Sequence, residues 1–466
     1  MSATEKLFVR SIPWRHLVGA LVAGTLLRAF MLYLVAYRFD VGDANSYDQL
    51  AVNLIDHGVY GYEEAPPIVP TVLRPPGYSM FLAAVFQLFG HSYVAVQILQ
   101  IIISLATCVL VAVTAARIVR EHTALPTALP VVALWAGALS PFDSVYCGAL
   151  LSEVVCTALL VAGICIPLLS ASPWRWLAAG VAFGAAALVR DVFLLFVPFA
   201  LVVWVIAHPR PRSGRELARS AATLLLGTVL AVAPWTARNY AHTGKLIPIS
   251  EGSLGTALWM GGWSTNGAFT ASDATGTRQY PDEAYLSADE RELVDRGWAT
   301  TDGRERHRIF MDLFWRRVRA EPHLVLGRWL IRLPRLWLGT RFDIFAFTPT
   351  ALAYGSVPWT ILKVCLLALD AVLVGLGLVG LVVVIRRRIL PLIWLATPTL
   401  YLTLLFLPLN SFETRYSHPA LPLLIVLASL AALLAYARVA RRARGKGTGP
   451  SWGHDATGEA VADRSS

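Results

Sequence analysis

The sequence carries little charge for its length. Only 15% of its 466 residues are Asp, Glu, Lys or Arg, whereas 56% are hydrophobic, and the mean hydropathy is +0.57. A soluble enzyme of this size needs a more polar surface, so these values argue against a cytosolic protein. They predict one large membrane domain instead, because apolar runs of about 20 residues recur along nearly the whole chain.

Cysteine is scarce as well, and it forms no motif. Cys108, Cys156, Cys165 and Cys365 fall inside apolar runs, and Cys147 lies just before one. None belongs to a CxxC pair, which argues against a zinc knuckle or a disulfide framework. We therefore interpret the cysteines as small packing residues.

Basic residues outnumber acidic ones by 40 to 30. The excess lies mostly in short loops between apolar runs, as in membrane proteins whose basic loops stay in the cytoplasm. We therefore expect the lipid bilayer, and no nucleic acid, as a partner. With the N-terminus in the cytoplasm, every dense basic cluster falls on the cytoplasmic side.

Hydropathy and charge together predict an all-α, polytopic membrane protein of about ten spans. An even number of spans returns the C-terminus to the cytoplasm, so both termini are expected there. The first apolar run is long enough to remain in the membrane, and we expect no cleavable signal peptide. The predicted spans are 16–37, 92–116, 124–141, 149–169, 174–189, 192–208, 219–236, 356–385, 389–408 and 417–437.

Two predicted outer segments are long, at 38–91 and 237–355. In the second, Arg328, Arg332 and Arg335 recur at four- and three-residue spacing among apolar residues. That period places the three arginines on one helical face and predicts an amphipathic helix on the membrane surface. The expected architecture therefore adds outer juxtamembrane helices to the spans.

The second outer segment also contains a turn-rich stretch at 261–267 and a charged helical pattern over 282–319. Because of its glycines and length, we expect the part at 261–300 to move as a lid over a site. Residues 1–437 would form the membrane domain. The remainder, 438–466, is rich in Gly, Ser, Ala and charge and is predicted to be a basic, disordered cytoplasmic tail.

The first outer segment offers a carboxylate directly after the first span. Gly42 breaks the chain and Asp43 precedes an amphipathic helical pattern, so Asp43 could serve only as the cap of that helix. Alternatively, it acts at the membrane surface as a metal ligand or as a general base, since glycosyl transfer needs a carboxylate to deprotonate the acceptor. Asp40 and Asp48 are the nearby competitors.

An arginine follows in the motif Arg-Pro-Pro-Gly-Tyr at 74–78. The two prolines fix the backbone, so Arg74 is held at a defined point. Its guanidinium suits a lipid phosphate, to which it can donate two parallel hydrogen bonds. The alternative is unspecific pairing with anionic headgroups.

A second acidic site is predicted at the next outer loop, where Asp143 is followed by Ser152 and Glu153. Glu153 opens an otherwise apolar span, and an unpaired carboxylate buried there would be costly. A polar cavity, a cation or a partner explains this residue more readily than packing does. The alternative is a helix that starts at Ser152, with the carboxylate favoured by the helix dipole.

Three more arginines reach the same predicted face. Arg190 either pairs with its neighbour Asp191 or adds positive charge to an outer cavity. Arg238 lies in the motif Pro-Trp-Thr-Ala-Arg-Asn-Tyr at 234–240, and Arg415 lies just before the last span. The predicted topology brings six charged residues to one side of the membrane: Asp43, Arg74, Glu153, Arg190, Arg238 and Arg415.

These motifs resemble landmarks of a known group, the bacterial relatives of protein O-mannosyltransferases. The group belongs to the GT-C glycosyltransferases and includes the lipid A aminoarabinose transferases. The resemblance covers about residues 15–435 and rests on five strings: Gly42-Asp43 with Tyr47, the 74–78 motif that ends at Tyr78, Leu-Ser-Glu at 151–153, the 234–240 motif with Asn239, and Arg415-Tyr416 with the prolines after it.

The resemblance implies sugar transfer from a polyprenyl phosphate to an envelope glycan, lipid or protein, on the outer face of the cytoplasmic membrane. By position, Asp43 would match the catalytic acidic residue, Arg74 the residue that meets the carrier phosphate, and Glu153 the second acidic position. A lipid phosphate leaves with its own negative charge, so arginines would stabilise it while the carboxylate activates the acceptor in a direct, inverting displacement. Further candidates for the site are Arg190, Arg238, Arg415, Tyr47, Tyr78, Asp143, Asn239 and Tyr416.

One departure from the group concerns metal binding. The first loop reads Gly-Asp-Ala where many relatives have Asp-Glu, and no cluster of histidines compensates for the lost carboxylate. A divalent ion would have Asp43 and Glu153 as its ligands, and no other cofactor is expected. Two rival functions stay open: a flippase or transporter of lipid-linked sugars, and a ligase or polymerase of such glycans.

Overall fold

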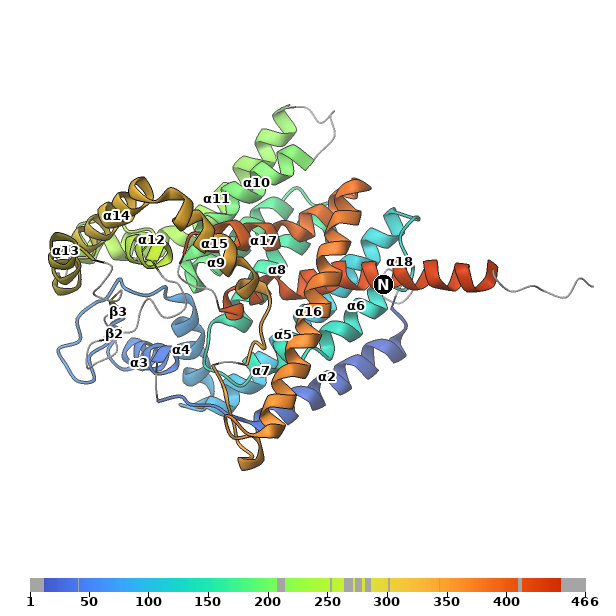
Figure 1. Cartoon of the computed structure of the whole chain (residues 1–466), viewed down its shortest axis with the longest axis horizontal. Coiled ribbons are helices and arrows are strands. Elements are labelled where there is room, and N and C mark those ends of the chain that lie inside the picture. Colours follow the sequence, from blue (N-terminus) through green and yellow to red (C-terminus); the bar gives the residue numbers. More distant parts are fainter. Residues whose placement is uncertain are drawn as a thin grey trace, which may run out of the picture.

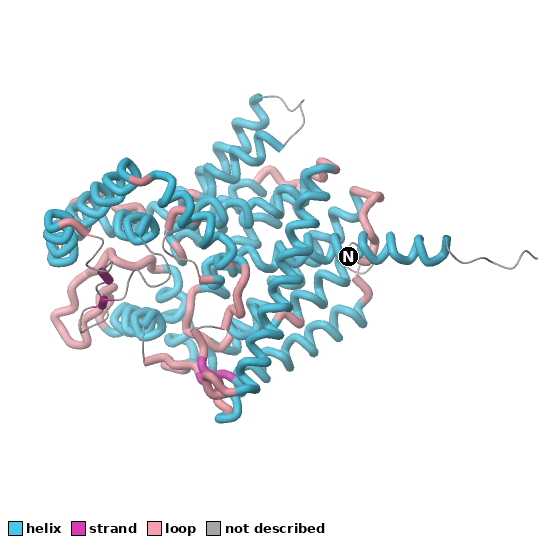
Figure 2. Tube along the Cα trace, in the orientation of Figure 1, coloured by secondary structure: helices cyan, strands magenta, loops and turns pink. Residues whose placement is uncertain are grey.

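The fold is almost entirely helical, as predicted (Figures 1 and 2). Two short antiparallel pairs are the strands of the described residues: β1 (Val35–Ala36) with β4 (Ala346–Phe347), and β2 (Ala271–Ser272) with β3 (Gln279–Tyr280). The computed structural model describes residues 12–40, 42–207, 214–251, 254–263, 271–272, 279–280, 286–300, 302–342, 344–409 and 413–445.

Each of the ten predicted spans overlaps an apolar helix. Five helices of the described residues are long and apolar enough to cross a membrane: α2 (Trp14–Leu34), α5 (Tyr93–Glu121), α11 (Gly214–Thr243), α16 (Val357–Arg386) and α18 (Leu421–Gly445). The others are shorter: α6 (Leu129–Ala138), α8 (Glu153–Leu169), α9 (Arg175–Val189), α10 (Phe196–Ala207) and α17 (Leu390–Phe406). The chain is therefore a multi-pass membrane protein, and the count of ten spans stays a prediction.

The predicted span 124–141 is not one helix. After α6 ends, α7 (Pro141–Tyr146) begins with Pro141 in its first turn, and the hydroxyl of Ser140 accepts a hydrogen bond from the amide of Asp143. Proline starts a helix readily but cannot continue one. The Ser-Pro pair therefore ends the span early and starts a separate short helix.

Small residues allow the membrane helices to pack closely. A Cβ atom added to Gly180 of α9 would lie 2.1 Å from the carbonyl oxygen of Leu224 in α11. Likewise, a Cβ on Gly227 of α11 would lie 2.2 Å from the carbonyl oxygen of Leu177. In lipid, close backbone contacts of this kind contribute the packing energy that holds helices together.

One arginine is buried inside the bundle. Arg28 of α2 is fully buried; it donates hydrogen bonds to Ser104 Oγ of α5 at 2.9 Å and to the carbonyl oxygen of Ala138, the last residue of α6, at 2.8 Å. A charge in a membrane span is tolerated where its donors find partners. Arg28 thereby ties three helices together.

The helices of the two predicted outer segments gather at one end of the molecule, and the C-terminal end of α18 projects from the opposite end (Figure 1). The first segment forms α3 (Gly42–Asp56) and α4 (Gly77–Phe89). The second forms α12 (Leu254–Trp263), α13 (Ala288–Ala299), α14 (Gly303–Ala320) and α15 (Pro322–Trp337). The described part of the charged pattern over 282–319 thus contains two helices, and they pack with α12 around an aromatic core that includes Trp259, Phe310 and Phe314.

The helix predicted around the three arginines is confirmed as α15, and its place on the membrane surface stays a prediction. The turn predicted at 261–267 is wrong at its start. Gly261 and Gly262 belong to α12, and their carbonyl oxygens accept hydrogen bonds from Arg332 at 3.1 Å and Arg328 at 2.8 Å. The last carbonyls of a helix lack partners within it, and here the two arginines supply them. Asn266 and Gly267, which belong to the same prediction, lie outside the described residues.

Two further predictions concern segments that are described only in part. The tail was predicted to begin at 438, yet α18 continues through 445, because its Ala- and Arg-rich end favours a helix. Residues 446–466 lie outside the described part of the chain. The lid predicted at 261–300 includes several stretches that are not described, and it stays a prediction.

Candidate active site at the outer-loop end

Asp43 stands at the start of α3 and contacts two arginines. Gly42 before it has a φ of +61°, which glycine adopts without strain, and the chain enters α3 there. The carboxylate accepts hydrogen bonds from Arg74 Nη2 at 2.8 Å and from Arg415 Nη2 at 3.1 Å, one on each oxygen. Both oxygens are thus held by arginines rather than by the backbone amides that a helix cap would serve.

The three side chains are partly open to solvent. Asp43 is 30% exposed, Arg74 29% and Arg415 19%. Burial raises the pKa of Asp43, but the charges of the two arginines and their hydrogen bonds outweigh it and hold this pKa below its usual value. Burial lowers the pKa of both arginines in turn, and neighbouring negative groups outweigh it and raise them. Asp43 is therefore ionised at neutral pH.

Two aromatic rings in edge-to-face contact support Arg74. Its guanidinium carbon lies 5.2 Å from the centre of the Tyr47 ring, and this ring lies 4.9 Å from that of Tyr78. The Tyr78 hydroxyl donates a hydrogen bond to Gln100 Oε1 of α5 at 3.1 Å. The predicted candidates Tyr47 and Tyr78 therefore connect the arginine to a long membrane helix.

The second acidic position forms a buried ion pair. Arg190 Nη2 donates to Glu153 Oε1 at 2.7 Å, Arg190 Nε donates to Ser152 Oγ at 3.0 Å, and the Glu153 side chain is 1% exposed. Within the described part of the chain, Glu153 Oε2 has no hydrogen-bond partner. Arg190 does not pair with Asp191, whose carboxylate accepts a hydrogen bond from the Ser250 hydroxyl. Glu153 is also the first residue of α8, after the N-cap residue Ser152, so the structure shows both the predicted helix start and a paired charge.

Tyr416 lies between the two ion pairs. Its ring centre is 5.0 Å from the guanidinium carbon of Arg415 and 5.8 Å from that of Arg190. Tyr416 thus connects the ion pairs of Asp43 with those of Glu153, and the three arginines and two carboxylates come from five separate parts of the sequence. We call this group the charged cluster: Asp43, Arg74, Glu153, Arg190 and Arg415. Arg415 also forms an ion pair with Glu413, whose side chain is 58% exposed, so the three arginines have three carboxylate partners.

Arg238 and Asn239 were predicted for the same site, but their contacts lie elsewhere. Arg238 Nη1 donates to the carbonyl oxygen of Thr71 at 2.7 Å, and Asn239 Nδ2 donates to that of Ile249 at 2.9 Å. Both residues thus fasten outer segments to α11. Because Thr71 lies three residues before Arg74, Arg238 holds the loop that presents the cluster arginine.

The remaining acidic candidates lie outside the charged cluster. Asp143 is buried in α7, and its Oδ1 lies 3.6 Å from Nε2 of His418 in the short helix η5 (His418–Ala420). Asp40 pairs with Arg38 in solvent, and Asp48 pairs with His91. Of the three acidic residues near the end of the first span, Asp43 is the one held by arginines of the cluster.

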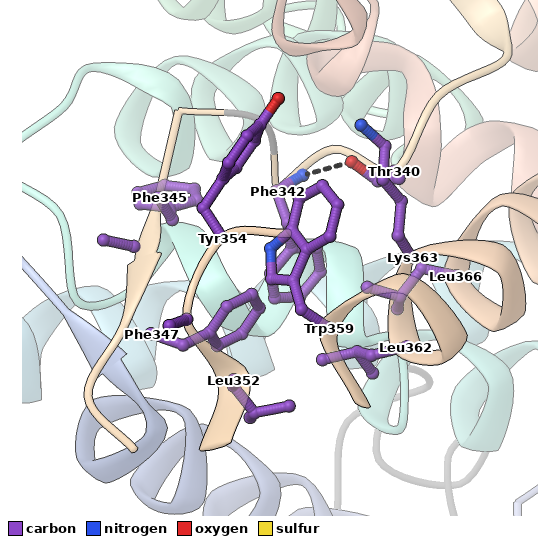
Figure 3. Close-up of a pocket in the computed structure, with 12 residues that line it drawn as sticks. Thr340, Phe342, Phe345, Phe347, Leu352, Tyr354, Trp359, Leu362, Lys363 and Leu366 are labelled. Carbon is purple, nitrogen blue, oxygen red and sulfur yellow. Dashed lines mark hydrogen bonds between the residues drawn. The ribbon is translucent and has the colours of Figure 1, made fainter. Parts of the chain in front are cut away.

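Two cavities flank the segment 338–347. The first, of about 310 Å³, lies beside Arg415 and is also lined by Tyr146, Arg335 and Glu413. The second, of about 260 Å³, is lined mainly by aromatic side chains. Figure 3 shows Phe342, Tyr354 and Trp359 close together in the second cavity, with Thr340 and Lys363 to one side. The cavity beside Arg415 is the one that adjoins the charged cluster.

The cluster does not fit a divalent cation. The described residues contain no group of three or more His, Cys, Asp and Glu side chains that could hold a metal ion. Arginines hold Asp43 and Glu153, and a positive guanidinium next to each carboxylate opposes a bound cation. We therefore derive no reaction step through a metal.

A second buried ion pair, between Arg341 and Asp370, escaped the sequence analysis. The available signal was a lone aspartate in the middle of an apolar run of about 30 residues, where an ionisable side chain points to a function or a partner. This pair lies next to the segment that carries Arg415.

Comparison with known sequences gives a partial match. A family model described as dolichyl-phosphate-mannose-protein mannosyltransferase matches residues 73–237, about a third of the chain. The matched part includes Arg74, Glu153 and Arg190 but neither Asp43 nor Arg415. No curated protein matches the chain in sequence.

Comparison with solved structures extends over nearly the whole chain. The structure of the archaeal oligosaccharyltransferase AglB from Archaeoglobus fulgidus, in complex with an inhibitory peptide and a dolichol-phosphate, is similar with a TM-score of 0.52 and 13% identity, over 95% of this chain and 53% of that one. The chain has the GT-C fold. A structure of the same archaeal enzyme with Zn and sulfate gives a TM-score of 0.51 at 14% identity, over 92% and 50% of the two chains.

The chain spans about half the length of the archaeal enzyme. A further match is ArnT from Cupriavidus metallidurans bound to undecaprenyl phosphate, with a TM-score of 0.38 and 13% identity over 96% of this chain and 82% of that one. The expected GT-C architecture is confirmed at the level of the fold. The roles of the site residues are proposals.

Proposed function

We propose that this protein is a glycosyltransferase that moves a sugar from a polyprenyl phosphate to an acceptor of the cell envelope, at the outer face of the cytoplasmic membrane. The observation that carries the proposal is the contact of Asp43 with Arg74 and Arg415. Two guanidinium groups can bind a phosphate, and a carboxylate can accept a proton. Sugar transfer from a lipid phosphate needs both groups at one place.

The residues of the cluster then have defined tasks. Asp43 takes the proton of an acceptor hydroxyl or amine while that oxygen or nitrogen attacks the anomeric carbon of the sugar. The bond between this carbon and the phosphate oxygen breaks, and the oxygen keeps the bonding electrons. Arg74 and Arg415 stabilise the negative charge that develops on the phosphate. Direct displacement of this kind inverts the anomeric centre.

The contacts of Asp43 add a condition to this mechanism. A carboxylate whose pKa is held below its usual value by two arginines is a weak base. A donor phosphate would compete with Asp43 for the same two guanidinium groups. Binding of the donor would therefore release the carboxylate, raise its pKa and strengthen it as a base. In this mechanism, binding of the donor activates Asp43 as the base.

The buried ion pair between Arg190 and Glu153 supports the same function. Arg190 lies against Tyr416, and Glu153 fixes its orientation through a buried ion pair. In this proposal Arg190, whose side chain is 15% exposed, adds a third guanidinium near the donor phosphate. Two findings support the class of the donor: AglB is bound to a dolichol-phosphate, and the matching family model carries a dolichyl-phosphate-mannose description.

The test is comparative mass spectrometry of envelope glycans, glycolipids and glycoproteins. The samples are cells with the native chain, cells without it, and cells with Asp43→Asn. We expect one sugar modification to disappear both in the cells without the chain and in the Asp43→Asn cells, because the variant keeps the fold but lacks the base.

The matched control is Asp40→Asn, which changes the same residue type three positions away, where the carboxylate is 71% exposed and pairs with Arg38. This control should keep the modification. A modification that is lost without the chain but retained with Asp43→Asn would contradict the assigned base and favour a transporter of lipid-linked sugars.

A further inference from the structure

A fully buried ion pair lies beside the charged cluster. Arg341 Nε donates to Asp370 Oδ1 at 2.8 Å, and both side chains are 0% exposed. Asp370 lies in the middle of α16, whereas Arg341 belongs to the loop that follows α15. Taking two charges out of water is costly, so a pair like this persists only where further hydrogen bonds satisfy both groups.

The other hydrogen bonds of Arg341 reach the segment that carries Arg415. Arg341 Nη1 donates to the carbonyl oxygen of Thr414 at 3.0 Å and to Ser417 Oγ at 3.2 Å. Ser417 Oγ in turn donates to the carbonyl oxygen of Leu336 in α15 at 2.7 Å. The guanidinium therefore holds the residue before Arg415 and the residue two positions after it, at the two ends of the short helix η4 (Thr414–Tyr416).

The backbone of Arg341 adds a second, independent observation. Its φ is +58°, in the left-handed region that residues other than glycine rarely adopt. The loop is nevertheless fixed there, because Gly339 N donates to Asp370 Oδ2 at 3.1 Å and Arg341 Nη2 donates to the Trp337 carbonyl oxygen at 3.3 Å. Strain of this kind persists where surrounding contacts impose it, and it is concentrated near functional sites.

We propose that Arg341 and Asp370 are positioning residues for the transfer reaction. They fix η4 to α15 and to the membrane helix α16, so that Arg415 reaches Asp43 and the donor phosphate. The pair acts on the ligand through the backbone of Thr414 and through Arg415. This inference rests on the proposed function, since it takes Arg415 as a ligand of the donor phosphate.

The test is a double-mutant cycle with the full-length chain in lipid nanodiscs and undecaprenyl phosphate as the probe. Arg415→Ala should weaken binding about tenfold, because one charged hydrogen-bond donor is lost. Asp370→Asn should weaken binding several-fold when Arg415 is present. In the Arg415→Ala background the same change should have no further effect, because residues that act through one another are not additive.

A milder variant keeps the test decisive if Asp370→Asn does not fold. Ser417→Ala removes one hydrogen-bond partner of Arg341 but leaves the ion pair in place. We expect it to weaken binding about twofold to threefold with Arg415 present and not at all without it. The matched control is Ser104→Ala, which removes the serine partner of another buried arginine, Arg28, and should leave binding unchanged in both backgrounds.

The outcomes separate the two claims. Equal fold-losses for Asp370→Asn or Ser417→Ala in both backgrounds would overturn the positioning role, because a general loss of stability does not depend on Arg415. Unchanged binding of both variants with Arg415 present would overturn it as well. If Arg415→Ala itself binds the probe normally, it is the proposed function that fails.

Discussion

The two carboxylates of the charged cluster have the same charge but very different surroundings. Asp43 is 30% exposed, and each of its oxygens contacts an arginine. Glu153 is 1% exposed, with one oxygen held by Arg190 and the other without a hydrogen-bond partner among the described residues. A partly exposed ion pair contributes little to stability, whereas breaking a buried one leaves an uncompensated charge.

This difference assigns different tasks to the two positions. The arginines that hold Asp43 can exchange it for a phosphate at low cost, so Asp43 suits a residue that changes partners during a reaction. Glu153, which is 1% exposed, cannot give up Arg190 without leaving its own buried carboxylate without a counter-charge. It therefore suits a residue that fixes the electrostatics of the site. The following variants test this contrast, in order of expected effect.

The largest effect is expected for Asp43→Asn. Loss of a general base should lower the rate of sugar transfer by about 100-fold or more. The free energy of unfolding should change by only about 1 kcal/mol, because the ion pair is half-exposed. The measurement is transfer from a polyprenyl phosphate sugar by the purified chain in vesicles, with thermal unfolding alongside. A rate above about a tenth of the native one, with normal folding, would exclude Asp43 as the base.

For Glu153→Gln we expect a large change in the free energy of unfolding, in contrast to Asp43→Asn. Removal of this buried charge should destabilise the protein by about 3 kcal/mol, because Arg190 remains buried without its counter-charge. The control is Glu121→Gln, whose carboxylate is 48% exposed and pairs with Arg117 four residues earlier; it should cost at most about 0.5 kcal/mol. Thermal unfolding in detergent compares the two variants, and equal melting temperatures would contradict the contrast.

Arg74→Ala should act on the donor rather than on stability. With one of two phosphate ligands gone, we expect the KM for the polyprenyl phosphate sugar to rise about tenfold. Arg38→Ala, which removes an arginine that is 65% exposed in the same outer segment, is the matched control and should leave KM unchanged. If both variants raise KM equally, the effect is unspecific attraction of anions by the loop.

The smallest effect concerns pH. Because the pKa of Asp43 is lowered in the folded chain, its pairing stabilises the protein above the unfolded pKa of about 4 and is lost as pH falls through the folded value. The difference in unfolding free energy between the native chain and Asp43→Asn should therefore stay constant from neutral pH down to about pH 4. A difference that already shrinks between pH 7 and pH 5 would show that arginines do not hold Asp43.

Most of the fold could be predicted, because hydropathy alone places apolar helices. The predictions failed where a local signal competed with it. The helix α6 ends at Ala138 rather than at the predicted residue 141, because Ser140 and Pro141 start a new helix. The helical preference of alanine and arginine carries α18 past the expected start of the tail. Each of these local signals was present in the sequence, but the three-dimensional packing decides whether it or the apolar pattern sets the end of a helix.

The sequence predicted which residues belong to the charged cluster better than it predicted which ion pairs they form. Five of the six charged residues placed on one side by the predicted topology do meet in the charged cluster. The partner of Arg190 was open between its neighbour Asp191 and an outer cavity, and the structure gives Glu153, 37 positions away. Arg238 has the same charge as the cluster arginines but binds backbone carbonyls. Pairing depends on where helices cross, and a single sequence does not contain this information.

The central claim is that Asp43 occupies the place of the donor phosphate on Arg74 and Arg415. The most direct test is the affinity of undecaprenyl phosphate for the native chain and for Asp43→Asn, both in lipid nanodiscs. With the competing carboxylate gone, the account predicts that the inactive variant binds the lipid phosphate several-fold more tightly. Equal or weaker binding by a correctly folded Asp43→Asn variant would contradict it.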